Sequence, residues 1–165
     1  MVAMSAPHPE AMNRRLRSDP RQMLRSWYMG FFQIPWLPEF LLASNRHWLL
    51  RRVLLRTSRA GAFSRSQLQR YELAWSQTGA LTGMLNWYRA GLRAVTNPRK
   101  QDAVIDAAVL IVWGKRDFAL RYEMARQSAA FCTRARVEIL EDATHWLHHE
   151  EAPRLQEMML AFLNG

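Results

Sequence analysis

The run Val109-Leu110-Ile111-Val112-Trp113-Gly114 indicates the fold class of this 165-residue sequence. Five apolar residues, three of them β-branched, stand in a row and end directly at a glycine. A short unbroken apolar run that stops at a turn residue is typical of a strand with both faces buried, because a strand with one face in water alternates apolar and polar residues. Strands of that kind lie in parallel sheets with helices on both sides. The run therefore predicts an α/β protein.

The residues after this run continue the same pattern. Residues 120–131 have helical spacing, residues 137–140 form a second short apolar strand, and a helix from about Pro153 carries its apolar residues on one side and ends at Gly165. The order strand, helix, strand, helix predicts parallel pairing through right-handed crossovers.

The residues before the run divide into a short strand and a long helical segment. Residues 1–6 are a small apolar run that Pro7-His8-Pro9 closes, since proline removes the N–H donor that a strand needs. From residue 12 to about residue 96 the apolar residues recur at helical intervals. Pro38 suits a first helical turn, and Ser66 is a candidate N-cap for a helix that ends at Trp75.

The most economical arrangement places residues 1–6 in the same sheet as the later strands. We therefore expect residues 1–11 to hold a core strand, residues 12–98 to form a helical insertion, and residues 99–165 to complete the core after a loop at residues 97–100. The predicted fold class is α/β, with a short parallel sheet of about three strands and an inserted helical segment.

The net charge of +9 is concentrated in the helical segment. Residues 14–93 contain fourteen arginines and only three acidic residues. A basic segment of this size could meet a nucleic-acid backbone or an anionic membrane surface. The arginines are spread among leucine, tryptophan and phenylalanine at helical spacing, however, which is typical of the solvated edge of amphipathic helices. Because no nucleic-acid-binding signature accompanies the charge, we expect no nucleic-acid partner.

Cysteine use and hydropathy indicate a cytoplasmic chain without a membrane span. Cys132 is the single cysteine, so no internal disulfide can form, and we interpret it as a packing residue at the end of a helix. The most apolar window, residues 27–37, is too short to cross a bilayer and is interrupted by Gln33 and Pro35. No charged leader with an apolar segment behind it is present, so we expect a reducing cytoplasm.

Three polar residues follow the predicted strands, at the edge where open parallel sheets bind ligands. His8 follows the first strand, Asp117 the second and His145 the third. An aspartate and a histidine from neighbouring strand ends can come within hydrogen-bond reach, and the carboxylate then fixes the imidazole tautomer. That pair is the acid and base of a hydrolytic triad in the order nucleophile, acid, histidine. A turn aspartate and a structural histidine are the alternatives.

Two groups of motifs resemble a known superfamily. The stretch Val-Leu-Ile-Val-Trp-Gly-Lys-Arg-Asp at residues 109–117 resembles the acid segment of α/β-hydrolases, and Thr144-His145-Trp146 followed by residues 149–153 resembles the histidine segment. Residues 26–35 and Leu85-Asn86-Trp87-Tyr88-Arg89 are similar to the lid helices of the epoxide hydrolase branch. The resemblance covers nearly the whole chain and keeps the family's order, so it implies a partial α/β-hydrolase fold with residues 12–98 as the lid.

The resemblance implies a role for four residues. Asp117 matches the triad acid, His145 matches the histidine that activates water, and Tyr28 and Tyr88 match the paired lid tyrosines that bind the epoxide oxygen as the ring opens. In this family an aspartate attacks a ring carbon, and water hydrolyses the resulting alkyl ester to a diol. The implied substrate is a small epoxide or related apolar molecule, with no cofactor and no metal. Aromatic packing is the alternative for the tyrosines.

The nucleophile that the family requires does not occur in these residues. No aspartate or serine has glycines two positions away on both sides, as the strand-to-helix elbow needs. We therefore expect a carboxyl-terminal portion that is inactive alone, with an open edge on its first strand. Such an edge predicts association with a complementary amino-terminal half or with a second copy.

Two other functions remain open. A haloalkane dehalogenase or an esterase could use the same fold, and Trp27, Trp36 and Trp87 are compatible with halide binding, although the tyrosine pair argues against it. A non-catalytic interaction module could use the basic helices or the open strand edge to bind another chain.

Overall fold

The structure is a computed structural model that describes residues 1–96 and 104–165. The described residues divide into two compact units. The core unit consists of Met1–Arg25 and Lys100–Gly165, and the helical unit is Ser26–Arg99. The predicted loop at residues 97–100 and the predicted boundary at residues 98 and 99 lie outside the described residues.

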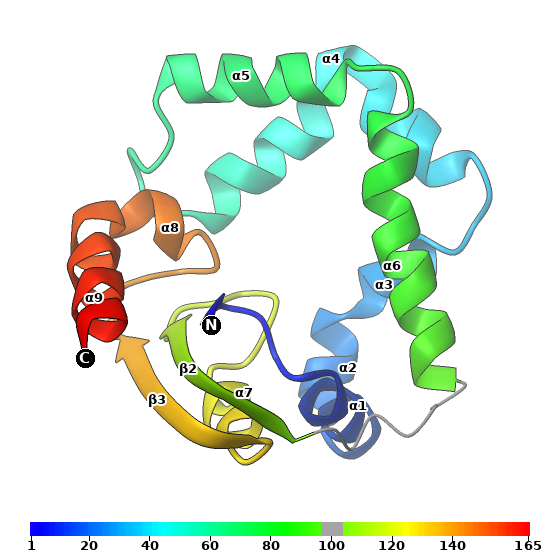
Figure 1. The fold of residues 1–165 in the computed structure, drawn as a ribbon. Helices are drawn as coiled ribbons and strands as arrows, with labels where there is room; N and C mark the ends of the chain where they lie inside the picture. The colour runs from blue at the N-terminus through cyan, green and yellow to red at the C-terminus, as the bar shows by residue number, and fades with distance from the viewer. Residues whose placement is uncertain (97–103) are drawn as a thin grey trace. The chain divides into compact units, whose positions relative to one another are not determined.

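Within the described residues, the core unit contains one parallel sheet of three strands (Figure 1). The strands are β1 (Val2–Met4), β2 (Ile105–Gly114) and β3 (Cys132–Leu140), in the order β1-β2-β3. Ile111 lies opposite Ala3 on one side and Val137 on the other. The predicted short parallel sheet is therefore confirmed, and the apolar run that predicts it is the central strand.

The third strand begins earlier than its apolar residues indicate. Cys132 pairs with Ile105 at the start of β3, so the prediction that Cys132 ends a helix is wrong. The residues at positions 133–136 are exposed, and two of them are arginines. This half of the strand therefore lacks the apolar pattern from which a strand is predicted. Burial raises the pKa of the Cys132 thiol, which agrees with a packing residue rather than a reactive one.

Helices cover both faces of the sheet. The core unit contains α1 (Pro9–Ser18), α2 (Pro20–Arg25), α7 (Glu123–Ala129), α8 (Leu147–Glu150) and α9 (Ala152–Asn164). Figure 1 shows α7 and α9 on opposite sides of the strands. Alternate residues of β2 enter two separate apolar clusters. One cluster holds Val109, Ile111 and Trp113 with Met124 of α7, and the other holds Leu110 and Val112 with Leu147 of α8 and Leu155 of α9. This burial on both faces explains the continuous apolar run.

The first two helices of the predicted insertion belong to the core unit. Met12 of α1 packs against the cluster around β2 and α7, and Gln22 of α2 is fully buried. The helical unit therefore starts at residue 26 and not at residue 12. The physical reason is that α1 packs against α7, while the Gln22 side chain of α2 hydrogen-bonds to the backbone of the loop after β2.

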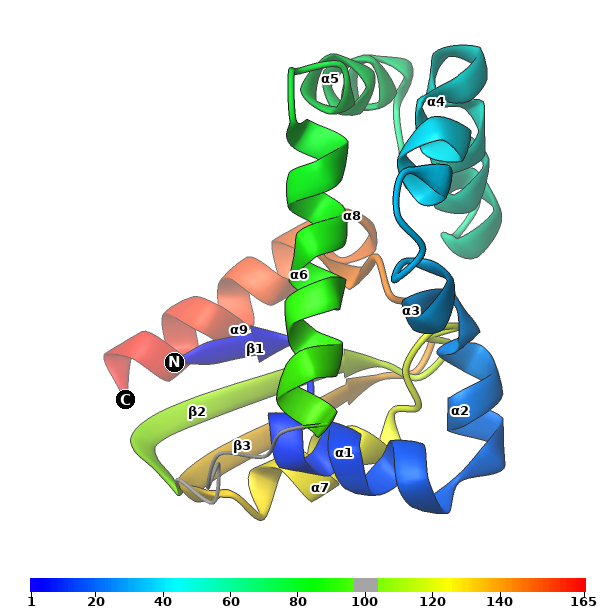
Figure 2. The ribbon, with the colours of Figure 1, turned by 90° about the vertical axis from the view of Figure 1, so that its right-hand side faces the viewer.

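The helical unit contains α3 (Trp27–Phe31), α4 (Leu37–Thr57), α5 (Arg65–Trp75) and α6 (Ala80–Thr96), which Figure 2 shows from the side. Pro38 lies in the first turn of α4 as predicted. The N-cap of α5 is Ser64 and not Ser66, because the Ser64 side chain accepts from the backbone of Gln67 while the Gln67 side chain accepts from the backbone of Ser64. In the described part of the chain, none of the helices combines the length and apolar character that crossing a membrane requires.

Candidate active site

The loop after β2 carries Asp117 and lies directly against the loop after β3. The backbone N–H of Lys115 donates to the carbonyl of Leu140, and that of Arg116 donates to the carbonyl of Ala143. A side chain at Gly114 would overlap the backbone oxygens of Ala143 and Thr144. Glycine is therefore required where β2 ends, because the two loops approach too closely for a Cβ.

The Asp117 carboxylate has different partners on its two oxygens. Oδ1 accepts from the backbone N–H groups of Ala119 at 2.8 Å and Leu120 at 2.9 Å. Oδ2 lies 2.8 Å from Nδ1 of His145. The side chain is fully buried. The backbone donors compensate the carboxylate for lost water and aim its second oxygen at the histidine.

His145 is oriented by this carboxylate. Because Nδ1 faces the Asp117 carboxylate, it carries the proton, and Nε2 is left as the basic nitrogen. The imidazole lies edge-to-face with Phe118 and Trp146, at ring-centroid distances of 6.0 and 5.5 Å. The His145 side chain is 29% exposed, so the ring is anchored on one side and open on another. This geometry suits a general base.

Glu150 fixes the loop that carries His145. Its two carboxylate oxygens accept from the backbone N–H and the hydroxyl of Thr144, each at 2.7 Å. The Thr144 hydroxyl oxygen in turn accepts from the backbone N–H of Trp146 at 3.2 Å. The Glu150 side chain, on α8, thereby fixes the backbone on both sides of His145. No role was predicted for Glu150, because an acidic residue five positions after a histidine carries no signal by itself.

Gln22 and Arg25 of α2 hold the acid loop from its other side. The Gln22 amide donates to the carbonyl of Ala119 at 2.9 Å and accepts from the backbone N–H of Arg121 at 3.1 Å. Arg25 donates to the carbonyl of Asp117 at 3.2 Å. Sequence reasoning missed both residues, because they are more than 90 positions from the loop that they hold.

Tyr28 and Tyr88 lie side by side in the helical unit. Their ring centroids are 5.7 Å apart, with an interplanar angle of 85°. The Phe32 ring lies 5.0 Å from that of Tyr88. Burial raises the pKa of the Tyr88 phenol. The two tyrosines, 60 positions apart in the sequence, thus form one aromatic pair that α3 and α6 supply.

His8 does not lie with the other predicted site residues. Its backbone N–H donates to the Ser128 hydroxyl at 2.8 Å, and its ring stacks on Phe131 with centroids 4.4 Å apart. Phe131 directly precedes β3, so His8 lies at the amino end of that strand and not at the carboxyl edge. Its Nδ1 accepts from the backbone N–H of Glu10 and caps α1. The prediction that His8 belongs to the site edge is therefore wrong.

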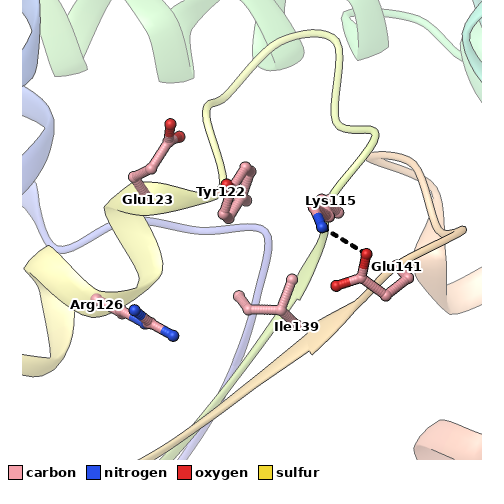
Figure 3. A pocket seen from close by; sticks show the side chains of 6 residues that line it. All are labelled: Lys115, Tyr122, Glu123, Arg126, Ile139 and Glu141. Atoms are coloured by element: carbon pink, nitrogen blue, oxygen red, sulfur yellow. Dashed lines mark hydrogen bonds and ion pairs between the residues drawn. The ribbon is translucent and has the colours of Figure 1, made fainter.

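A separate surface cavity of about 300 Å³ lies beside α7 (Figure 3). Its lining residues carry both signs of charge: Lys115, Tyr122, Glu123, Arg126, Ile139 and Glu141. The ammonium of Lys115 pairs with the carboxylate of Glu141 across its rim, as the dashed line shows. Neither Asp117 nor His145 lines this cavity. Among the described residues, no group of three or more histidine, cysteine or acidic side chains is arranged to hold a metal.

Comparison with known proteins identifies relatives over the full length of the chain. The chain is 32% identical over 165 residues to the AB hydrolase superfamily protein YfhM of Bacillus subtilis (strain 168), covering all of this chain and 57% of that protein. It is 31% identical over 169 residues to Epoxide hydrolase 2 of Caenorhabditis elegans, covering 99% of this chain and 47% of that protein. The chain thus spans about half the length of the curated relatives it matches. No family model matches it.

Solved structures show the same architecture. The crystal structure of the Bacillus megaterium epoxide hydrolase in complex with an inhibitor matches 99% of this chain and 60% of that chain, with a TM-score of 0.84 and 25% sequence identity. The three-stranded parallel sheet with helices on both faces is therefore part of an α/β-hydrolase fold. Over its whole length the chain is similar to proteins named as an α/β-hydrolase superfamily member and as epoxide hydrolases.

Proposed function

We propose that this chain is the part of an epoxide hydrolase that supplies the triad acid, the histidine base and the tyrosine donors. The hydrogen bond of 2.8 Å between Asp117 and His145 carries the proposal, because a buried carboxylate on Nδ1 leaves Nε2 ready to take a proton from water. Relatives named epoxide hydrolases, and the paired tyrosines, favour an epoxide over other substrates of this fold.

The reaction has two steps, and the residues of this chain act in both. In the first step an aspartate outside these 165 residues attacks an epoxide carbon, the carbon–oxygen bond breaks, and the ring oxygen takes a proton from a tyrosine. In the second step Nε2 of His145 takes a proton from water as the water attacks the ester carbonyl, the bond to the alkyl oxygen breaks, and that oxygen takes the proton from the imidazolium as the diol leaves. The carboxylic acid that remains then returns its proton to the tyrosinate of the first step, which restores the nucleophile. The Asp117 carboxylate stabilises the imidazolium that forms.

Tyr28 and Tyr88 are the proposed donors of the first step. A phenol whose pKa is raised by burial stays protonated at neutral pH, which is the form that donates a hydrogen bond to a developing alkoxide. The Tyr88 ring is in edge-to-face contact with the Tyr28 ring, so the two phenol rings are neighbours in the helical unit. We propose that this unit serves as the lid of the site.

The test compares the chain alone with a longer version that contains the nucleophile. The purified 165-residue chain is expected to form no diol from styrene oxide, whereas the longer version forms diol. In the longer version, His145→Gln should accumulate the alkyl ester, which intact-protein mass spectrometry detects, because ring opening does not need the base. The double change Tyr28→Phe and Tyr88→Phe should give neither ester nor diol.

Three results would contradict the proposal. Ordinary diol formation by the double tyrosine variant would remove the donor role, and diol formation by the isolated chain would remove the need for an outside nucleophile. Halide release from a haloalkane, without hydrolysis of styrene oxide, would indicate a dehalogenase rather than an epoxide hydrolase.

A further inference from the structure

Arg89, which directly follows Tyr88 on α6, uses all three nitrogens of its guanidinium. Nε donates to the carbonyl of Phe32 at 2.9 Å, and Nη2 donates to the carbonyl of Ile34 at 3.2 Å. Nη1 donates to the carboxylate of Glu39 at 2.7 Å and to the side-chain oxygen of Asn86 at 3.2 Å. The Arg89 side chain is 18% exposed, so the guanidinium is partly shielded from water.

These bonds join the two helices that carry the tyrosines. Phe32 and Ile34 follow the end of α3, the helix of Tyr28, whereas Arg89 lies beside Tyr88 on α6. Helix α3 has only five residues, which is too short to be stable without tertiary contacts. The position of Tyr28 therefore depends on what holds the backbone at the end of α3, and the guanidinium holds it at two carbonyls.

The charge of Glu39 locks the guanidinium in place. Glu39 lies in the first turn of α4, and its hydrogen bond with Arg89 holds the pKa of the Glu39 carboxyl below its usual value, so the pair stays charged at neutral pH. A planar guanidinium donates in several fixed directions at once, which the single ammonium of lysine does not reproduce. The arrangement thus needs arginine.

We propose that Arg89 is a positioning residue that fixes the Tyr28 ring against the Tyr88 ring, so that both phenols can serve one oxygen of the substrate. The role in substrate binding rests on the proposed function, whereas the fixing of the two rings does not. Arg89 acts through the backbone of residues 32 and 34 and through α6, and not by touching the reacting atoms.

The first test uses the 165-residue chain itself and needs no substrate. In Arg89→Met, the nuclear Overhauser contacts between the Tyr28 and Tyr88 rings should disappear, and the pKa of the Tyr88 phenol should fall towards its ordinary value as the ring gains water. Arg89→Lys should show the same changes in smaller measure. The matched control is Arg51→Met, which removes an arginine from a more exposed ion pair with Glu72 in the same unit and should change neither signal.

Retention of the ring contacts and of the raised Tyr88 pKa in Arg89→Met would overturn the proposal. If Arg89→Met unfolds the helical unit, Glu39→Gln tests the positioning role instead. This change keeps the shape of the side chain and removes only the charge that holds the guanidinium. A lowered Tyr88 pKa in Glu39→Gln supports the positioning role, and an unchanged Tyr88 pKa contradicts it.

The second test uses the longer version with the nucleophile and separates the two steps of the reaction. Arg89→Met should slow formation of the alkyl ester by up to about 100-fold, as expected for a displacement of roughly 1 Å, and leave hydrolysis of the ester unchanged. Equal slowing of both steps would indicate a general structural defect and contradict the positioning role. If Tyr28→Phe and Tyr88→Phe leave turnover intact, the proposed function fails, while the ring contacts still decide the role of Arg89.

Discussion

Asp117 is the residue on which the geometry of the core-unit site depends most directly. Its Oδ1 accepts from two backbone N–H groups, and its Oδ2 faces His145. Removal of the carboxylate would leave those donors buried without an acceptor. The same side chain therefore contributes to the stability of the loop and to the orientation of the imidazole.

We expect Asp117→Ala to lower the free energy of unfolding, because each orphaned buried donor costs about 1–3 kcal/mol. Urea unfolding followed by circular dichroism measures the loss. The control is Asp142→Ala, which removes the exposed carboxylate that pairs with Arg116 and should cost at most about 1 kcal/mol. Equal losses in the two variants would show that the Asp117 hydrogen bonds contribute nothing beyond a surface ion pair.

At the scale of elements, the site depends on how closely the loops after β2 and β3 approach each other. At Gly114 the loops are too close for a side chain, because any Cβ there would meet the backbone of Ala143 and Thr144. By contrast, a Cβ at Gly91, inside α6, would have nothing within 4 Å. The two glycines therefore have opposite consequences for stability.

We expect Gly114→Ala to destabilise the chain by about 1–3 kcal/mol, the usual cost of overpacking, and to weaken the low-field proton signal of the Asp117–His145 hydrogen bond. Gly91→Ala should instead stabilise α6 by about 0.5–1 kcal/mol, because alanine loses less backbone entropy in a helix. Thermal unfolding and one-dimensional proton NMR measure both effects. A Gly114→Ala variant with unchanged stability and signal would mean that the loops can separate without cost.

The start of α5 offers a second prediction at this scale. Ser64→Ala removes the N-cap side chain and half of the capping box, so the free energy of unfolding should fall by about 1 kcal/mol. Ser66→Ala, one residue inside the first turn, should change it by less than about 0.5 kcal/mol. Urea unfolding of the two variants tests this, and a larger effect at Ser66 would restore Ser66 as the cap.

For the whole molecule, the arrangement of histidines predicts how stability responds to acid. Burial lowers the pKa of His148, and the neighbouring charges of His149 and His145 lower it further; burial also lowers the pKa of His149. Because the folded chain takes up these protons less readily than the unfolded chain, stability is full above pH 6.5 and falls as the pH drops below that value.

We expect the free energy of unfolding to fall between pH 7.5 and pH 5.5, and the fall to be smaller in His148→Gln, since glutamine takes up no proton. Urea unfolding at the two pH values measures both quantities. The double variant His148→Gln and His149→Gln should flatten the dependence further. An identical fall in the wild-type chain and in both variants would assign the acid sensitivity to other groups.

The order of the strands in the sheet came from the structure, whereas their parallel pairing and the approach of Asp117 to His145 were predictable from the sequence. These follow from short-range signals, because an unbroken apolar run reports burial on both faces, and the carboxyl ends of parallel strands meet at one edge. The pairing of Tyr28 with Tyr88 was likewise predicted from the resemblance of their segments to lid helices. The two residues lie together in the helical unit.

The residues that support the site are identified by the folded structure. Gln22 lies 97 positions from Ala119, and Arg89 lies 57 positions from Phe32, so no local pattern connects them. It also assigned α1 and α2 to the core unit, placed His8 at the amino end of β3, and extended β3 through its arginines. A backbone carbonyl or N–H group has no side-chain identity, and the His8–Phe131 ring contact joins residues far apart in the sequence, so these partners are known only once the chain has folded.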